Sequence, residues 1–255
     1  MAEEDHIIPS QTLFIGLLVG TVITIIVFVS IILSRSDVTL NANTVFNKDF
    51  SLWRGISIFI FYIWVLGIDF GYFEKYKINH RIILKNNYPK YPISTDLFSI
   101  AGVFSIIFII VFTIYALQIA GILEIYAVAP QWLPLFVWGP FLLFLFNPFP
   151  ILYHYGRRTF FKMFFNGLMS VFFVVDFPKV WAIAQSISLV NVFQDLVYSF
   201  CFYSTLTFPY NPKVNECKTP AIQARFVYTV IIYAIRIVQC TKVGCGNGTS
   251  VWKKT

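Results

Sequence analysis

The 255-residue chain is 58% hydrophobic and 19% aromatic, and only 12% of its residues are charged. Soluble domains carry about 25% charged residues, so too few polar side chains remain here to cover a soluble globule. Together with a mean hydropathy of +0.73, this composition predicts an all-α, polytopic transmembrane bundle of about six to seven helices. The net charge of +7 does not indicate nucleic-acid binding, because Lys and Arg lie between the apolar runs, where they orient membrane helices.

Apolar runs long enough to cross a bilayer, about 20 residues, recur along the chain. The predicted spans are Thr12–Ser34, Gly55–Phe73, Leu97–Leu123, Ile125–Asn147, Val180–Phe208 and Phe226–Thr241. Prolines in the fourth span predict a kink or a late start, because proline removes a helix hydrogen bond. The fifth is long enough to be one broken or strongly tilted helix. Met163–Val175 is short for a span, so it either crosses or lies in the interface.

The distribution of charge predicts how the chain is oriented. The loop after the second span carries five basic residues, so we expect it, and the N-terminus, on the cytoplasmic side; they are Lys75, Lys77, Arg81, Lys85 and Lys90. The same bias does not decide the side of the C-terminus. The acidic start "MAEEDH" is unlike a signal peptide, so the first span should be retained. The predicted parts are a cytoplasmic tail (1–11), a transmembrane domain (12–242) and a polar tail (243–255).

Four cysteines, Cys201, Cys217, Cys240 and Cys245, do not form a pattern typical of a disulfide framework. Cys201 and Cys240 fall within apolar runs and are interpreted as small packing residues. The spacing of the cysteines and histidines does not suit a metal site, and we expect no cofactor. A nucleophile–base pair and a phosphate-binding loop are also missing from the sequence, so the chain is not expected to be an enzyme.

Ionisable residues inside apolar runs mark either an ion pair or a solute pathway, because each costs about 2.5–3.5 kcal/mol to insert. Asp69, Asp195 and Arg236 are the three such residues. Asp195 belongs to a polar set spaced at three or four residues, which predicts one helical face; the set is Gln185, Ser188, Asn191, Asp195 and Ser199.

A second polar face is predicted on the last span. Arg225 and Arg236 are three helical turns apart, about 16 Å along the axis, and Thr229 and Gln239 share their face. Asp195 and Arg236 could form one structural ion pair. Alternatively, the two polar faces line a water-filled route, in which two arginines favour an anion with carboxylate or phosphate oxygens. In either case we expect a basic group from another helix to pair with Asp195, with Arg236 as the first choice.

A basic and aromatic cluster, "NPFPILYHYGRR" (147–158), follows the fourth span and contains Tyr153 and Arg157. One interpretation is that its basic residues hold the helix end on the cytoplasmic side while its tyrosines lie at the membrane interface. The other is that the cluster forms the mouth of the anion route. Asp69 also has two interpretations: a buried charge inside the second span, or a residue at the membrane interface, because it lies next to Gly71 near the end of the span.

Several stretches resemble the EXS-domain family of eukaryotic phosphate exporters. The resembling stretches are "LFIGLLVG", "LWRGISIFIFYIWVLGIDFGYFEKYKINHRIIL", "LFNPFPILYHYGRR", "DLVYSFCFYS" and "RFVYTVIIYAIRIVQC", so the resemblance runs from about residue 13 to residue 242. It implies export of inorganic phosphate through a central path lined by basic residues. In this sequence Arg225, Arg236, Tyr153, Arg157 and Asp195 match positions of the family's motifs, and Gln239 lies in the "QC" of the last one.

The resemblance has departures. Where the family has a "DFWLADQ"-like stretch, this chain has "KVWAIAQ", with Lys179 and Ala184 at the acidic positions. The family's later helices and its N-terminal SPX sensor domain have no counterpart here, so the chain is expected to be a short or truncated relative. The alternative function is therefore a non-conducting membrane scaffold. The expected partners are inorganic phosphate, membrane lipids and, as protein partner, a second copy or a full-length relative, in the plasma membrane or an endomembrane.

Overall fold

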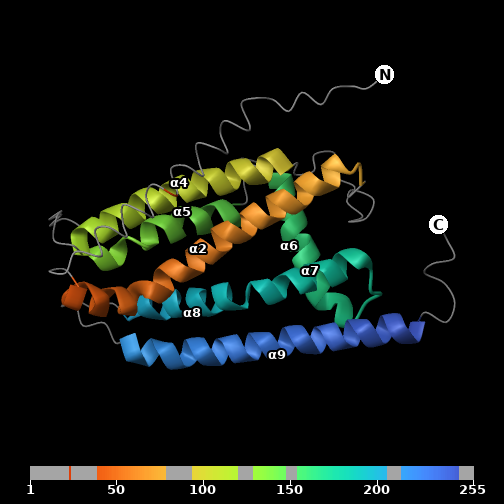
Figure 1. Ribbon diagram of the computed structural model, residues 1–255. Helices are drawn as coiled ribbons and strands as arrows, with labels where there is room; N and C mark the ends of the chain where they lie inside the picture. Colours follow the sequence, from red (N-terminus) through yellow and green to blue (C-terminus); the bar gives the residue numbers. More distant parts are fainter. Residues whose placement is uncertain are drawn as a thin grey trace, which may run out of the picture. The chain divides into compact units, whose positions relative to one another are not determined.

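The computed structural model describes residue 23 and residues 39–78, 94–119, 129–147, 154–205 and 214–246. The predicted first span therefore lies outside the described residues, apart from Ile23. Every regular element in the described ranges is a helix, which confirms the all-α prediction (Figure 1). In chain order the elements are α2 (Thr39–Lys75), α4 (Ser94–Ile119), η2 (Pro130–Trp132), α5 (Leu135–Phe146), α6 (His154–Leu168), η3 (Met169–Val171), α7 (Phe177–Ser188), α8 (Val190–Ser204) and α9 (Val214–Gly246).

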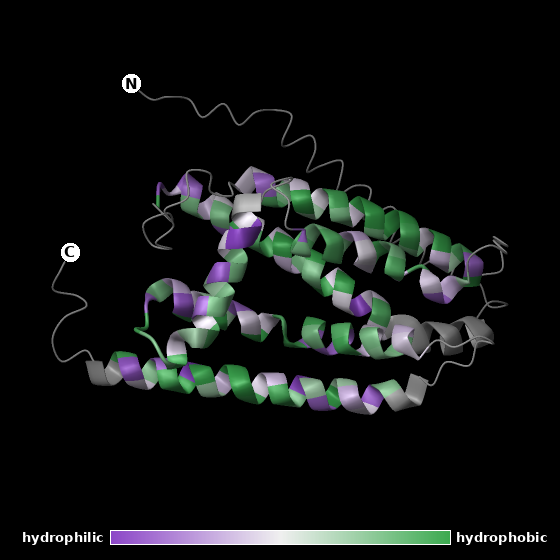
Figure 2. Ribbon diagram, turned by 180° about the vertical axis from the view of Figure 1, so that it is seen from behind, coloured by the Kyte–Doolittle hydropathy of each residue, from purple (hydrophilic) through white to green (hydrophobic). Residues whose placement is uncertain are grey.

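Three of these helices are long and apolar enough to cross a membrane: Ser51–Lys75 of α2, Ser94–Ile119 of α4 and Cys217–Val243 of α9. They confirm the second, third and last predicted spans, although α9 is far longer than Phe226–Thr241. Figure 2 shows α4 as almost wholly hydrophobic, whereas polar residues alternate along α9. The chain is accordingly a multi-pass integral membrane protein.

The predicted fifth span is a broken helix. Its two parts, α7 and α8, meet at Leu189 with a bend of 58°. Taken together, they are long and apolar enough to form one further membrane span. The fourth predicted span starts late, as its prolines predicted: a single 3-10 turn precedes Pro134, and α5 begins only at Leu135. Pro140 is accommodated inside α5.

The chain forms two compact units, and α2, α4 and α5 contribute residues to both. The first unit comprises residues 1–50 and 101–141. In its described part Phe141 of α5 packs edge-on against Phe104 of α4, with ring centroids 5.2 Å apart, and also against Trp138. Large aromatic rings bury much apolar area at little conformational cost, and they hold this pair of helices together.

The second unit, residues 51–100 and 142–255, carries most of the polar side chains discussed below. Its α9 runs antiparallel to the α7–α8 pair (Figure 1). One apolar cluster, with Leu52, Phe202 and Cys217, lies at the α8 end. At the opposite end Phe70 of α2 packs with Met163 of α6 and Trp181 of α7.

The segment Met163–Val175, which could have crossed the membrane, does not form a span. Its first residues complete α6, and a short 3-10 turn, Met169–Val171, follows. Met163 packs near the end of α2, whereas Leu168 and Val171 pack against α9. α6 and η3 therefore connect α2 with α9 at one end of the unit, and neither is among the helices long and apolar enough to cross a membrane.

Candidate functional site

One face of α9 is joined to α8, α7 and η3 by a ladder of contacts that we call the α9 seam. Its α9 members recur every three or four residues, so they share one side of the helix; they are Arg225, Tyr228, Ile232, Arg236, Gln239 and Lys242. Arg225 donates to Gln194 Oε1 at 3.4 Å, and Tyr228 Oη donates to the Ser186 carbonyl at 3.3 Å. Arg236 donates to the Val180 carbonyl of α7, so both arginines face the α7–α8 pair, and the prediction that they lie on one face of α9 is confirmed.

Asp195 is fully buried in α8, and its partner is Arg54 of α2. The guanidinium binds the carboxylate with two hydrogen bonds, Nε to Oδ2 at 2.9 Å and Nη2 to Oδ1 at 2.6 Å. The expectation of a basic partner from another helix is confirmed, but the choice of Arg236 was wrong. Arg236 instead donates to the Val180 carbonyl of α7 at 3.2 Å, about four turns of helix away from Asp195.

Arg54 was missed because the predicted second span began at Gly55, one residue after it. The helix α2 in fact begins at Thr39, so Arg54 sits on a continuous helix and faces α8. A usable signal was present in the sequence: "LWRGIS" places this arginine between apolar residues, and Leu52 and Trp53 just before it are both buried.

The predicted polar stripe around Asp195 is divided by the break at Leu189, because a bent helix cannot keep one face. Asp195 and Ser199 are buried on α8. Asn191, which the spacing placed beside them, is exposed. Asp195 and Ser199 of the predicted stripe therefore share a buried face of α8. The stripe does not continue as a single row into α7.

Arg225 and Arg236 retain unused hydrogen-bonding capacity. A guanidinium has five N–H donors, and each of these two donates a single hydrogen bond within the described part of the chain, to Gln194 and Val180 respectively. Arg225 is exposed, and Arg236 is partly buried. Because both acceptors are uncharged, the positive charges of these two side chains are not neutralised by their partners.

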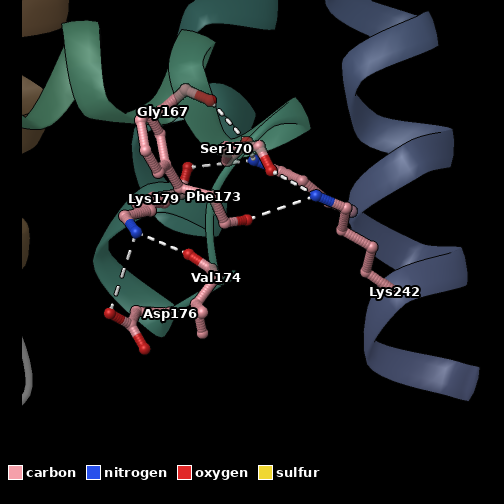
Figure 3. A network of polar contacts seen from close by, with 8 residues as sticks. Gly167, Ser170, Phe173, Val174, Asp176, Lys179 and Lys242 are labelled. Atoms are coloured by element: carbon pink, nitrogen blue, oxygen red, sulfur yellow. Dashed lines mark hydrogen bonds and ion pairs between the residues drawn. The ribbon is translucent and has the colours of Figure 1, made fainter. Parts of the chain in front are cut away.

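The far end of the seam is a closely bonded cap. Gln239 is buried, and its Nε2 donates to Ser170 Oγ at 2.8 Å. Lys242 donates to the carbonyls of Ser170 at 3.2 Å and Phe173 at 3.3 Å, and also to Val171 (Figure 3). Lysines near carbonyls at the end of a helix satisfy acceptors that the helix leaves open, so this cap fastens α9 to η3.

The same turn is held from its other side by Lys179 of α7. Its ammonium donates to the Val174 carbonyl and lies 3.9 Å from the Asp176 carboxylate (Figure 3). Gln239 was predicted to line the anion route. The structure places its side chain in this packed network, 1% exposed.

Arg157, the candidate from the basic cluster, lies on α6 away from the seam. It is buried, donates to the Phe144 carbonyl, and its guanidinium carbon lies 5.1 Å from the centre of the Phe144 ring. It lines an apolar cavity of about 130 Å³ together with Tyr62 and Trp181. Tyr153 lies outside the described residues. Asp69 is exposed on α2.

Cys201 and Cys217 form a disulfide, so the prediction that Cys201 is merely a packing residue was wrong. The last turn of α8 and the first turns of α9 lie side by side, which brings the two Cα atoms to 5.7 Å. This separation suits a disulfide. The sequence contained no signal for this neighbourhood, because it depends on the two helices forming an antiparallel pair.

The family model described as "EXS family" matches residues 50–250. Curated relatives include solute carrier family 53 member 1 of Cricetulus griseus, 28% identical over 201 residues, which cover 75% of this chain and 28% of that protein. The protein of the same name from Homo sapiens is 31% identical over 178 residues, covering 66% of this chain and 25% of the relative. Xenotropic and polytropic retrovirus receptor 1 homolog of Danio rerio is 32% identical over 154 residues, which cover 60% of this chain and 21% of that protein.

The chain thus spans about a quarter of the length of these relatives. The matched region nevertheless contains both partners of the buried ion pair and both α9 arginines.

Proposed function

Because this chain belongs to the EXS family, we propose that it is a membrane transporter that exports inorganic phosphate. The observation that carries the proposal is the pair of α9 guanidiniums, Arg225 and Arg236, on one face and with most of their donors unused in the described part. Guanidinium groups match the geometry of phosphate oxygens, because two parallel N–H donors reach two oxygens at once.

The charge balance of the seam supports an anion as the solute. Asp195 is paired with Arg54 through two hydrogen bonds, and its electrostatic interaction with Arg225 is the smaller one. The hydrogen-bond partner of Arg225, Gln194, is uncharged. Positive charges inside a membrane-spanning helix that donate hydrogen bonds only to uncharged acceptors are costly unless an anion or water reaches them. Phosphate in transit would meet Arg225 and Arg236 as two successive binding positions, about 16 Å apart along the helix.

The experiment compares arginine-to-lysine variants on the seam with a change of charge in the basic loop. The purified chain is reconstituted into vesicles loaded with radiolabelled phosphate, and efflux is normalised to the amount of inserted protein. We expect Arg225→Lys and Arg236→Lys each to lower efflux at least several-fold, because lysine retains the charge but loses the planar fork. A triple change of Lys75, Lys85 and Lys90 to glutamine should lower it far less, since solvated charges are screened within about 8–10 Å.

Two outcomes would overturn the proposal. If the loop variant abolished efflux while both lysine variants kept it, the route would not follow α9. If the unmodified chain moved no phosphate under conditions in which a full-length relative does, the chain would be a non-conducting scaffold.

A further inference from the structure

Between the two arginines the α9 seam holds Tyr228 and then the apolar, buried Ile232. Ile232 lies on the shared face, about 10 Å along the helix from Arg225 and about 6 Å from Arg236. Its side chain is 1% exposed, and it packs against Ile183 of α7, which is fully buried. The positive charges are therefore separated by a contact between two isoleucines.

Neighbouring side chains close this contact on several sides. Ile235 of α9 belongs to the same cluster, and Leu168, Val171, Ile187 and Tyr228 pack against it. On the Arg225 side the Tyr228 ring stacks on Phe193, with centroids 4.6 Å apart. On the α6 side the backbone approaches closely: a Cβ on Gly167 would lie 3.1 Å from Ile183 Cγ1. Ile183 and Ile232 thus lie in one closely packed, buried apolar cluster.

Such a contact is a barrier to an anion. Phosphate passing from one guanidinium to the other would have to leave its water shell beside alkyl groups that offer no hydrogen bonds, which is strongly unfavourable. Hydrophobic constrictions close other membrane pores in the same physical way, by excluding water.

We propose that Ile183 and Ile232 form a hydrophobic barrier that keeps the anion route closed between Arg225 and Arg236. This inference rests on the proposed function, since it assigns a gate to the same route. The barrier opens when α9 moves relative to α7 at this level. Their contacts beside the barrier include the single hydrogen bonds of Tyr228 and Arg236 to main-chain carbonyls.

The first test enlarges the barrier and measures phosphate efflux from reconstituted vesicles. Ile232→Ala and Ile183→Ala should each raise efflux several-fold over the unmodified chain, because a smaller side chain lets water bridge the two arginines. Ile231→Ala is the matched control: the same substitution one residue earlier on α9, at a side chain that is 49% exposed on the described surface. It should leave efflux unchanged. Gel filtration checks the fold, and Ile232→Val offers a milder change if alanine prevents folding.

The second test locks the barrier. In a background in which Cys240 and Cys245 are both replaced by serine, Ile183→Cys combined with Ile232→Cys should form a cross-link on oxidation. Efflux should then fall to background and recover on reduction. The Cys240→Ser/Cys245→Ser protein without the two new cysteines, treated with the same oxidant and reductant, controls for effects on Cys201–Cys217.

The outcomes separate the barrier from the proposed function. If the unmodified chain conducts and both alanine variants behave like Ile231→Ala, the barrier is wrong and the transport function stands. If the unmodified chain is silent and Ile232→Ala conducts, the barrier is supported and spontaneous transport by this chain is overturned. If all variants are silent, both proposals are overturned.

Discussion

At the scale of single residues, the pair between Arg54 and Asp195 is the dominant electrostatic feature of the described helices. Asp195 is fully buried, whereas the Arg54 side chain is 34% exposed, so the carboxylate depends on the guanidinium more than the reverse. Removing one partner of a buried ion pair leaves an uncompensated charge. The pair therefore holds α2 against α8.

We predict that Arg54→Met lowers the free energy of unfolding by about 3 kcal/mol, the lower end of the range for a broken buried pair because Arg54 is partly exposed. Asp195→Asn should be tolerated better than Asp195→Leu, since an amide still accepts a hydrogen bond from Arg54. The double variant Arg54→Met/Asp195→Leu should be less destabilised than the sum of the singles. Thermal unfolding in detergent measures the stability of these three single variants and the double variant, and Lys218→Met, at an exposed position, is the control. If the effects of Arg54→Met and Asp195→Leu were additive in the double variant, the two residues would not be coupled.

The sequence was sufficient to predict that Asp195 needs a basic partner, because an acid in an apolar run must be compensated. It was not sufficient to choose the partner. Arg54 and Asp195 are 141 positions apart, and helical spacing orders residues within one helix but not between two. Arg236 was the expected choice only because it was the basic residue recognised inside a span.

At the scale of helices, the disulfide between Cys201 and Cys217 makes α8 and α9 a closed hairpin. It is surrounded by Leu52, Phe202 and Ala221 in a buried cluster. Arg225 lies two turns further along α9 from Cys217, opposite Gln194. The cross-link thus sets the distance between the beginning of α9 and the part of α8 that carries Asp195.

We expect Cys201→Ser to lower the free energy of unfolding by about 3 kcal/mol, the value for a closed loop of about 15 residues. Cys217→Ala should cost a similar amount, and the double variant little more than either single one, because one bond is lost in all three. Differential scanning fluorimetry with and without reductant measures this. Cys240→Ser, which replaces an unpaired and exposed thiol, is the control. Equal melting temperatures for oxidised and reduced protein would contradict a stabilising disulfide.

Helices were predictable to the extent that local composition determines them. The apolar runs of α2, α4 and α9 predicted three spans, and Pro134 predicted the late start of α5. The break at Leu189 was expected somewhere in Val180–Phe208, but "SISLVNVF" contains no proline or glycine that would place it. The disulfide was not predictable, because the pairing of α8 with α9 is a tertiary feature.

At the scale of the molecule, the second unit has two chemically different ends. One carries the disulfide beside Leu52 near the start of the α2 span. The other carries Lys75 at the end of α2 and the lysine cap formed by Lys179 and Lys242. Disulfides persist in oxidising compartments, and basic residues favour the cytoplasmic side. From both rules we predict that the lysine end faces the cytoplasm, and the C-terminal end of α9 with it.

This topology predicts that the sequon Asn247-Gly-Thr is not glycosylated, because α9 crosses from the disulfide end over Cys217–Val243 and so delivers Asn247 to the cytoplasm. An epitope after Thr255 should be unstained in intact cells and stained once digitonin permeabilises the plasma membrane alone. An epitope inserted after Pro209 is the matched control. If the protein is in the plasma membrane, this epitope should be stained on intact cells. If the protein is in an inner membrane, it should stay unstained after digitonin treatment, which leaves inner membranes sealed. An endoglycosidase-sensitive shift that disappears in Asn247→Gln would reverse the orientation of α9. It would also place the disulfide in the reducing cytoplasm, where such a bond does not persist. Epitope staining and the glycosylation shift therefore test the orientation of α9 by two separate measurements.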